Sequence, residues 1–142
     1  MGSKAISNLT KNNKYQYGDF EIEASPLVSA CLQLIENSVT PVAMLDKELR
    51  YIARSDSWLE SYELKKEVLG RSHYEVFPTT PDKWREYIER CVKGETLSSE
   101  EDSVMRPDGT LDWMSWKISP WYISEGEVGG VLMFTNVITE QK

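Results

Sequence analysis

The residue types in this chain that could carry chemistry are one histidine, two cysteines and a run of three carboxylates. His73 is the single histidine, and it falls in a short predicted turn where a structural role is the more common one. Cys31 and Cys91 lie on the predicted apolar faces of two helices, so we expect both to be buried small hydrophobic groups rather than redox sensors. The acidic run at residues 100–102 predicts a solvated strand edge that discourages strand addition.

These residues do not form a catalytic or metal-binding pattern. No serine, cysteine or histidine nucleophile stands at a workable spacing from a base, and one histidine with two cysteines cannot supply a metal quartet. We therefore predict no catalytic residue and no metal site. The best enzymatic alternative is an isomerase-like cone fold, which would need a carboxylate among apolar strand residues to act as a base.

Met114, Trp116 and Ile118 form the most suggestive constellation, because their alternate spacing places all three on one face of a predicted strand. Two interpretations stay open for this face. It can be ordinary core, or it can line a mostly apolar pocket between a sheet and helices that accepts a small ligand.

Composition limits the partners of the chain. Its 142 residues, 40% of them hydrophobic, predict one domain with a core of its own. The net charge of −7 is opposite in sign to that of a phosphate-backbone binder. The longest apolar run, residues 131–134, is far shorter than the roughly 18 residues needed to span a bilayer. We expect no nucleic-acid partner, no direct membrane contact and, with only two cysteines, a reducing, cytoplasmic location.

The predicted elements alternate between helical and strand character along the chain. Ser25 and Pro26 predict the N-cap and first residue of a helix, and Thr80 is the expected N-cap of a second, longer helix. The run at 131–134 is apolar on both faces, which predicts a central strand covered on both sides. The predicted elements are a flexible tail (1–24), a flanking helix within 25–40, strands at 42–45 and 50–54, a helical block ending with a helix at 81–93, and strands at 97–106, 111–123 and 128–137.

Local hairpins join these strands, and the helical block forms the crossover between them. A tight turn is predicted at residues 107–109, and another at 124–127. The pattern predicts an α+β fold, in which a five-stranded antiparallel sheet carries helices on one face and an N-terminal flanking helix.

From Pro41 to Lys142 the sequence resembles a PAS domain, the sensory module of bacterial histidine kinases and cyclic-di-nucleotide enzymes. No single motif is specific, but their order and spacing continue through the whole of 41–142. The motifs that carry the resemblance are Pro41-Val42, Leu45-Asp46, Tyr51-Ile52-Ala53, Ser57-Trp58, the run from Leu69 to Pro78, Trp84-Arg85, Gly94-Glu95, Arg106-Pro107-Asp108-Gly109, Trp113, Trp116, Pro120-Trp121, Gly126, Gly129-Gly130, Phe134 and Ile138-Thr139-Glu140.

The resemblance implies a ligand pocket between the sheet and the helices. Arg71, near its mouth, would either hold an anionic group or form a surface salt bridge. Haem-binding members carry a histidine on the long helix, and flavin photoreceptors carry a cysteine soon after the Gly-Arg pair at 70–71; this sequence has neither. The resemblance thus argues against haem and adduct-forming flavin and leaves the ligand open. The implied pocket residues are Tyr74, Trp84, Tyr87, Met114, Trp116, Ile118, Phe134 and Arg71.

The resemblance also implies that a signal leaves through Val137, Ile138, Thr139 and Glu140 to a C-terminal effector beyond the chain. PAS domains usually carry an aspartate where Val137 stands, so the usual ion pair with a basic residue such as Arg106 is missing here. Packing can still transmit strain.

A homodimer through the N-terminal helix is expected, because the apolar stripe of that helix is wider than one small domain needs. The helix would pack on the outer sheet face near Trp113 or against a second subunit. An interaction-only PAS domain without a ligand is the alternative function.

Overall fold

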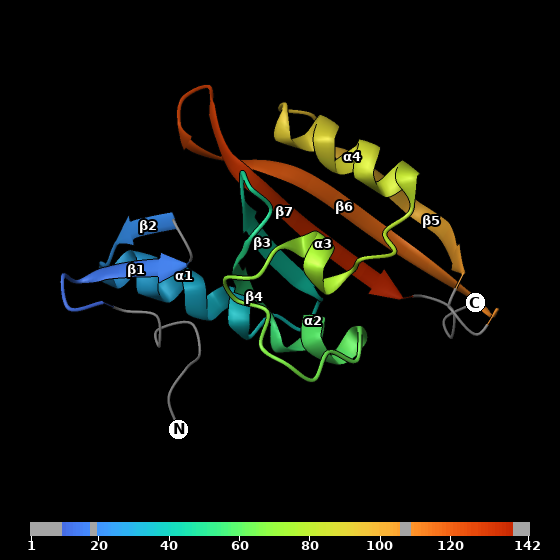
Figure 1. Cartoon of the computed structure of the whole chain (residues 1–142), viewed down its shortest axis with the longest axis horizontal. Helices are drawn as coiled ribbons and strands as arrows, with labels where there is room; N and C mark the ends of the chain where they lie inside the picture. The colour runs from blue at the N-terminus through green and yellow to red at the C-terminus, as the bar shows by residue number, and fades with distance from the viewer. Residues whose placement is uncertain (1–9, 18–19, 106–108, 138–142) are drawn as a thin grey trace.

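The computed structural model describes residues 10–17, 20–105 and 109–137, and its main feature is a five-stranded antiparallel sheet in the order β4-β3-β7-β6-β5 (Figure 1). Four helices and a separate two-stranded hairpin accompany this sheet, which confirms the predicted α+β fold. The elements are β1 (Lys14–Tyr17), β2 (Phe20–Glu23), α1 (Pro26–Glu36), β3 (Val42–Asp46), β4 (Tyr51–Arg54), α2 (Asp56–Ser61), α3 (His73–Val76), α4 (Asp82–Val92), β5 (Leu97–Met105), β6 (Leu111–Ser124) and β7 (Glu127–Val137).

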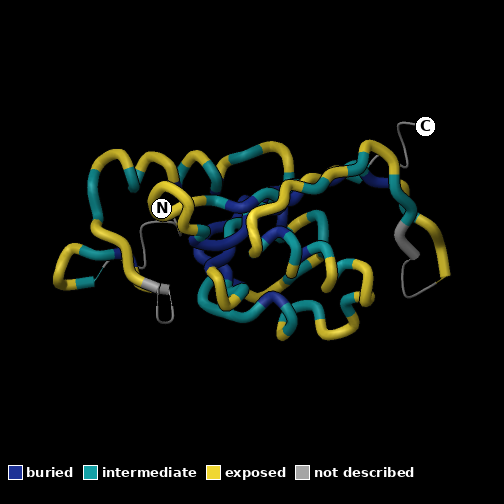
Figure 2. Tube along the Cα trace, turned by 90° about the horizontal axis from the view of Figure 1, so that it is seen from above, coloured by how far each residue is buried: buried dark blue, intermediate teal, exposed yellow. Residues whose placement is uncertain are grey.

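Strand alternation divides the sheet into an inner face, which carries Trp116, and an outer face. On the inner face, Leu45 of β3 lies opposite Val131 of β7, and Ile118 of β6 lies opposite Met133. All of these side chains are buried, and the residues of α2, α3 and α4 pack over them. The main core therefore lies between the inner face and these helices. In Figure 2 most of the buried trace lies in the middle of the molecule.

Helix α4 covers β6 and β7 with the face that the sequence predicted. Ile88 and Cys91 are fully buried on this face. The start of the helix differs from the prediction, because Pro81 occupies the N-cap position. The hydroxyl of Thr80 instead donates to the carbonyl oxygen of Phe77, at 2.6 Å, and so closes the preceding turn.

Strand β7 is the central strand, as predicted, but it is not covered equally on both sides. Its inner residues Val131 and Met133 are buried, whereas Leu132 and Phe134 on the outer face are only half-buried. The reason is that α2, α3 and α4 all pack on the inner face.

The predicted tail is wrong for residues 14–17 and 20–23, which form the paired antiparallel strands β1 and β2. The side chain of Tyr15 explains this ordering, because it is 1% exposed and lies in a second apolar cluster with Leu32, Ile52 and Ala53. Its hydroxyl also shares a hydrogen bond with Ser29 on α1. The buried side chain of Tyr15 thus attaches the hairpin to the domain.

Helix α1 begins as predicted, with the Ser25 hydroxyl accepting a hydrogen bond from the Val28 N–H. It packs on β4 rather than near Trp113, which corrects the sequence-based placement. A register shift between β3 and β4 lets two successive residues, Ile52 and Ala53, contribute to this contact.

Part of the apolar stripe of α1 stays open in the single chain. Leu27 and Leu34 are each 75% exposed, and Cys31 between them is exposed rather than buried as predicted. The physical reason is that α1 uses one face, with Leu32 at its centre, against β4.

Candidate ligand-binding and signalling site

Trp116 lies at the centre of a stack of aromatic rings between β6 and α4. Its ring centroid is 4.7 Å from that of Trp84 and 5.3 Å from that of Tyr87, which is nearly parallel to it at 28°. Trp116 and Met114 are each only 6% exposed, and Ile118 on the same strand is 1% exposed. The predicted constellation therefore forms, and its rings pack directly against one another.

Asp102 accepts a hydrogen bond from the Trp116 ring at the edge of this stack. The indole N–H of Trp116 donates to a carboxylate oxygen of Asp102 at 3.1 Å, and Lys83 of α4 lies 3.6 Å from the other oxygen. A register shift in β5 between Ser99 and Asp102 places Asp102 opposite Met114, on the inner face. The predicted solvated acidic edge is thus correct for Glu100 and Glu101, which are exposed, but wrong for Asp102.

A second aromatic cluster, which sequence reasoning missed, lies between β4, α2 and α3. Trp58 and Tyr62 have ring centroids 4.9 Å apart, and Tyr62 contacts Phe77 at 5.4 Å. His73 lies 5.8 Å from Tyr51 and 5.2 Å from Phe77. The sequence feature that could have indicated this cluster is the high aromatic content, five Trp and seven Tyr, which is more than one stack at Trp116 accommodates.

This second cluster is neutral and hydrogen-bonded. The Tyr51 hydroxyl lies 2.7 Å from Nδ1 of His73. Burial, helped by the nearby charge of Arg85, lowers the pKa of His73 to about 4, so its imidazole is uncharged at neutral pH. Burial also raises the pKa of Tyr51 and of Tyr62 above the usual range, so both phenols keep their protons.

An open groove of about 380 Å³ lies between α3, α4 and the turn that joins β3 to β4. Leu49, Ile88 and Val92 supply its apolar surface, and the ring of Tyr74 forms a wall. Leu49 adopts φ of +63°, a conformation that leucine rarely takes, in order to close the turn after Asp46. The remaining lining residues are Arg85, Glu89 and Lys93.

Six of the eight predicted pocket residues belong to the inner side of the domain, namely Tyr74, Trp84, Tyr87, Met114, Trp116 and Ile118. Phe134 does not join them, because it lies opposite Lys117 and Val42 on the outer face. The continuous apolar run of β7 gave no sign of which residues face inward. Arg71 forms a surface ion pair with Glu75 at 3.4 Å, in agreement with the second of its two expected roles.

The predicted exit for the signal begins at Val137, which lies opposite Met114 at the end of β7. Ile138, Thr139 and Glu140 lie outside the described residues, as do Arg106, Pro107 and Asp108 of the predicted hairpin turn.

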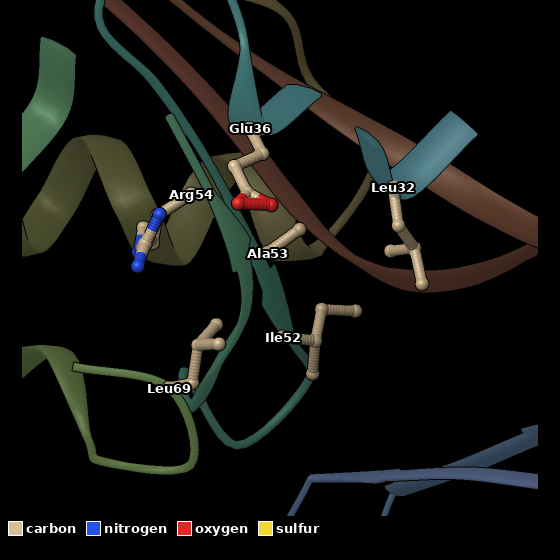
Figure 3. Close-up of a pocket in the computed structure, with 6 residues that line it drawn as sticks. All are labelled: Leu32, Glu36, Ile52, Ala53, Arg54 and Leu69. Carbon is tan, nitrogen blue, oxygen red and sulfur yellow. The ribbon is translucent and has the colours of Figure 1, made fainter. Parts of the chain in front are cut away.

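A small cavity of about 10 Å³ lies on the other side of β4, under α1 (Figure 3). Glu36 of α1 and Arg54 of β4 face it, together with the apolar side chains of Leu32 and Ile52. Arg54 is 5% exposed and donates to both carboxylate oxygens of Glu67, at 3.1 and 2.6 Å. The cavity holds at most a water molecule, so it is too small to be the ligand site.

Among residues 10–17, 20–105 and 109–137, no three His, Cys, Asp or Glu side chains gather in a metal-binding arrangement. Within the same ranges, no helix combines the length and the apolar character that crossing a membrane requires.

The family described as "PAS fold" matches residues 35–142, which is most of the chain. This chain belongs to the PAS family. Its sheet order and helical crossover are therefore those of a PAS domain, a family of sensory signalling modules. A search of curated proteins gives no match.

Several solved structures share the fold at low sequence identity. The PAS domain from Bordetella pertussis BvgS has a TM-score of 0.64 and 22% identity, over 82% of this chain and 90% of that one. The PAS domain of a Colwellia psychrerythraea protein has a TM-score of 0.60 and 15% identity, over 80% and 98%. VqmA bound to DPO has a TM-score of 0.59 and 17% identity, over 76% and 56%. The chain spans about half the length of the VqmA chains that it matches.

Proposed function

We propose that this PAS domain is the sensory module of a larger signal-transduction protein, a histidine kinase or a cyclic-di-nucleotide enzyme of the cytoplasm. A small ligand would bind at the helix-covered side of the sheet, and the change in packing would pass along β7 to a C-terminal effector. The VqmA structure with bound DPO supports ligand binding by a protein of this fold, although the likeness to VqmA extends to the fold alone.

The observation that carries the proposal is an unbroken series of contacts from the groove to β7. The Tyr74 ring on the groove wall lies 5.5 Å from that of His73, which contacts Phe77 at 5.2 Å. Phe77 contacts Tyr62, whose hydroxyl donates to Oγ1 of Thr135 at 3.0 Å.

Thr135 connects this series to the exit of the domain. It is buried on the inner face, directly opposite Trp116 and two residues before Val137. A ligand that displaces the Tyr74 ring can therefore bias the packing at the end of β7, provided that it binds one packing arrangement better than the other. Val137, Ile138, Thr139 and Glu140 are the residues proposed to pass this bias onward.

The test uses three eight-carbon probes of different charge: octanoate, 1-octanol and octylammonium. In NMR titrations of the full chain, we expect at least one probe to move the Ile88 and Val92 methyl signals and the Thr135 and Val137 amide signals with one common Kd. A chain in which none of the three gives saturable shifts would contradict the ligand-sensing function.

A second candidate function is homodimerisation through α1, which the exposed stripe on that helix favours. Leu27, Ala30, Cys31 and Leu34 recur at helical spacing and are all exposed in the single chain. The stripe carries no charge, so two copies can meet there despite a net charge of −7 on each.

Sedimentation at micromolar concentration tests this interface. The wild-type chain should be a dimer, and Leu34→Glu should convert it to a monomer. Leu111→Glu is the matched control, since Leu111 is also an exposed leucine, at 51%, but lies on β6. A monomeric wild type, or equal effects of the two substitutions, would exclude an interface at α1.

A further inference from the structure

Arg85 differs from the other described arginines in having no acidic partner. In this acidic chain, each of the other four forms an ion pair with at least one carboxylate. The pairs are Arg50 with Asp46 and Glu48, Arg54 with Asp56 and Glu67, Arg71 with Glu75, and Arg90 with Glu95. Among the residues that the structure describes, no carboxylate lies within ion-pair distance of Arg85.

Other contacts keep the Arg85 guanidinium at the groove. Its Cζ atom lies 4.2 Å from the centre of the Tyr74 ring, in a cation–π arrangement. Its Nε–H donates to the carbonyl oxygen of Thr80 at 3.3 Å. Glu89, one turn along α4, pairs with Lys93 at 3.6 Å instead. The terminal Nη groups of Arg85 therefore have no acceptor in the described part of the chain.

The groove beneath this cation is apolar. Leu49, Ile88 and Val92 line it, and Leu49 does so from a left-handed backbone conformation that glycine or asparagine would adopt more readily. A leucine at this position contributes apolar surface where the turn alone does not require it. The volume of about 380 Å³ is in the range of small-molecule sites, roughly 300–1,000 Å³.

We propose that the groove binds a small amphipathic carboxylate, with its apolar chain against Leu49, Ile88 and Val92 and its carboxylate on the Nη groups of Arg85. This ligand class rests on the proposed sensory function and adds its chemistry. A planar guanidinium presents two parallel N–H donors to a carboxylate, so the anion gains a charge-assisted, bidentate contact that an alcohol lacks. Lys93 and Glu89, which also line the groove, neutralise each other in an ion pair, so the carboxylate is assigned to Arg85.

The test compares octanoate with 1-octanol in titrations followed by the Leu49, Ile88 and Val92 methyl signals. Octanoate should bind at least about tenfold more tightly than 1-octanol, which corresponds to one charge-assisted hydrogen bond. Arg85→Gln should remove this preference, while leaving the affinity for 1-octanol within about twofold of the wild type. Arg71→Gln is the matched control, because Arg71 lies two residues before α3 and is already paired with Glu75.

A second variant distinguishes loss of the carboxylate contact from a folding defect caused by Arg85→Gln. Arg85→Lys keeps the charge without the planar donor pair, so octanoate should bind it with an affinity between those of the wild type and Arg85→Gln. Equal weakening of octanoate by Arg85→Gln and Arg71→Gln would overturn the proposal, because it would reveal only long-range attraction. Preferred binding of 1-octanol or octylammonium in the groove would also overturn it, and would leave the sensory function standing.

Discussion

The aromatic stack at Trp116 allows the most direct prediction about stability. Trp116→Ala removes a side chain that is 6% exposed and touches two other rings. Truncation of a buried tryptophan costs about 3–5 kcal/mol in unfolding free energy. Each ring pair contributes roughly 0.5–1.5 kcal/mol beyond its buried area. The partly exposed Asp102 carboxylate can recover water as its partner, which limits that loss. We therefore expect a loss of about 4 kcal/mol.

Urea unfolding followed by far-ultraviolet circular dichroism measures this loss without relying on tryptophan fluorescence. Trp116→Phe keeps the apolar ring but removes the indole N–H, so it should cost about 1–2 kcal/mol through the lost bond to Asp102. Trp113→Ala is the control, because Trp113 is a tryptophan of the same strand that alternation places on the opposite face, and it is 38% exposed. A loss below about 1 kcal/mol for Trp116→Ala, or equal losses for the two alanine variants, would refute the described packing.

Three further perturbations test other parts of the structure. The pKa of about 4 for His73 lies below its ordinary value of 6.5, so the unfolded chain binds the proton first as pH falls. Urea unfolding should show stability declining from about pH 6.5 to pH 4, by up to about 3 kcal/mol, and His73→Gln should lack this part of the decline; parallel pH profiles would contradict it. Burial raises the Cys91 pKa to about 11 from 9, which lowers the reactive thiolate fraction of the folded chain. In a Cys31→Ser chain, a chromogenic thiol reagent should therefore react with Cys91 about 100-fold more slowly before unfolding than after it. Equal rates would contradict the burial of Cys91. A Cβ at Gly130 would lie 1.8 Å from the backbone oxygen of Leu45, so Gly130→Ala should cost about 3 kcal/mol or more on chemical unfolding, and a neutral substitution would contradict the close β3–β7 approach.

Much of the fold was predictable because its local signals agree with the tertiary packing. The alternation at Met114, Trp116 and Ile118 specified the inner face of β6, and the helical spacing of Ile88 and Cys91 specified the buried face of α4. Two local hairpin groups and one helical crossover predicted a five-stranded antiparallel sheet, whereas the order of its strands came from the structure.

The features that escaped prediction depend on single register shifts or single side chains. One extra residue in β5 turned Asp102 inward, and the composition of the acidic run gave no sign of it. Phe134 was misplaced because an apolar run has no alternation from which to assign a face. Among the described residues Arg85 has no acidic partner because Glu89 pairs with Lys93, and only the three-dimensional geometry decides which of the two basic residues Glu89 contacts.

Binding at the groove is proposed to change the packing at the end of β7, and the contact between Tyr62 and Thr135 allows this coupling to be tested. Tyr62→Phe removes the hydroxyl that donates to Thr135 while keeping the ring against Phe77 and Trp58. With octanoate as the probe, the Ile88 methyl and Val137 amide signals of the wild-type chain should titrate with the same Kd. In Tyr62→Phe the Ile88 signal should still titrate while the Val137 shift shrinks. A Val137 signal that stays fixed in the wild type while Ile88 reaches saturation would contradict the account.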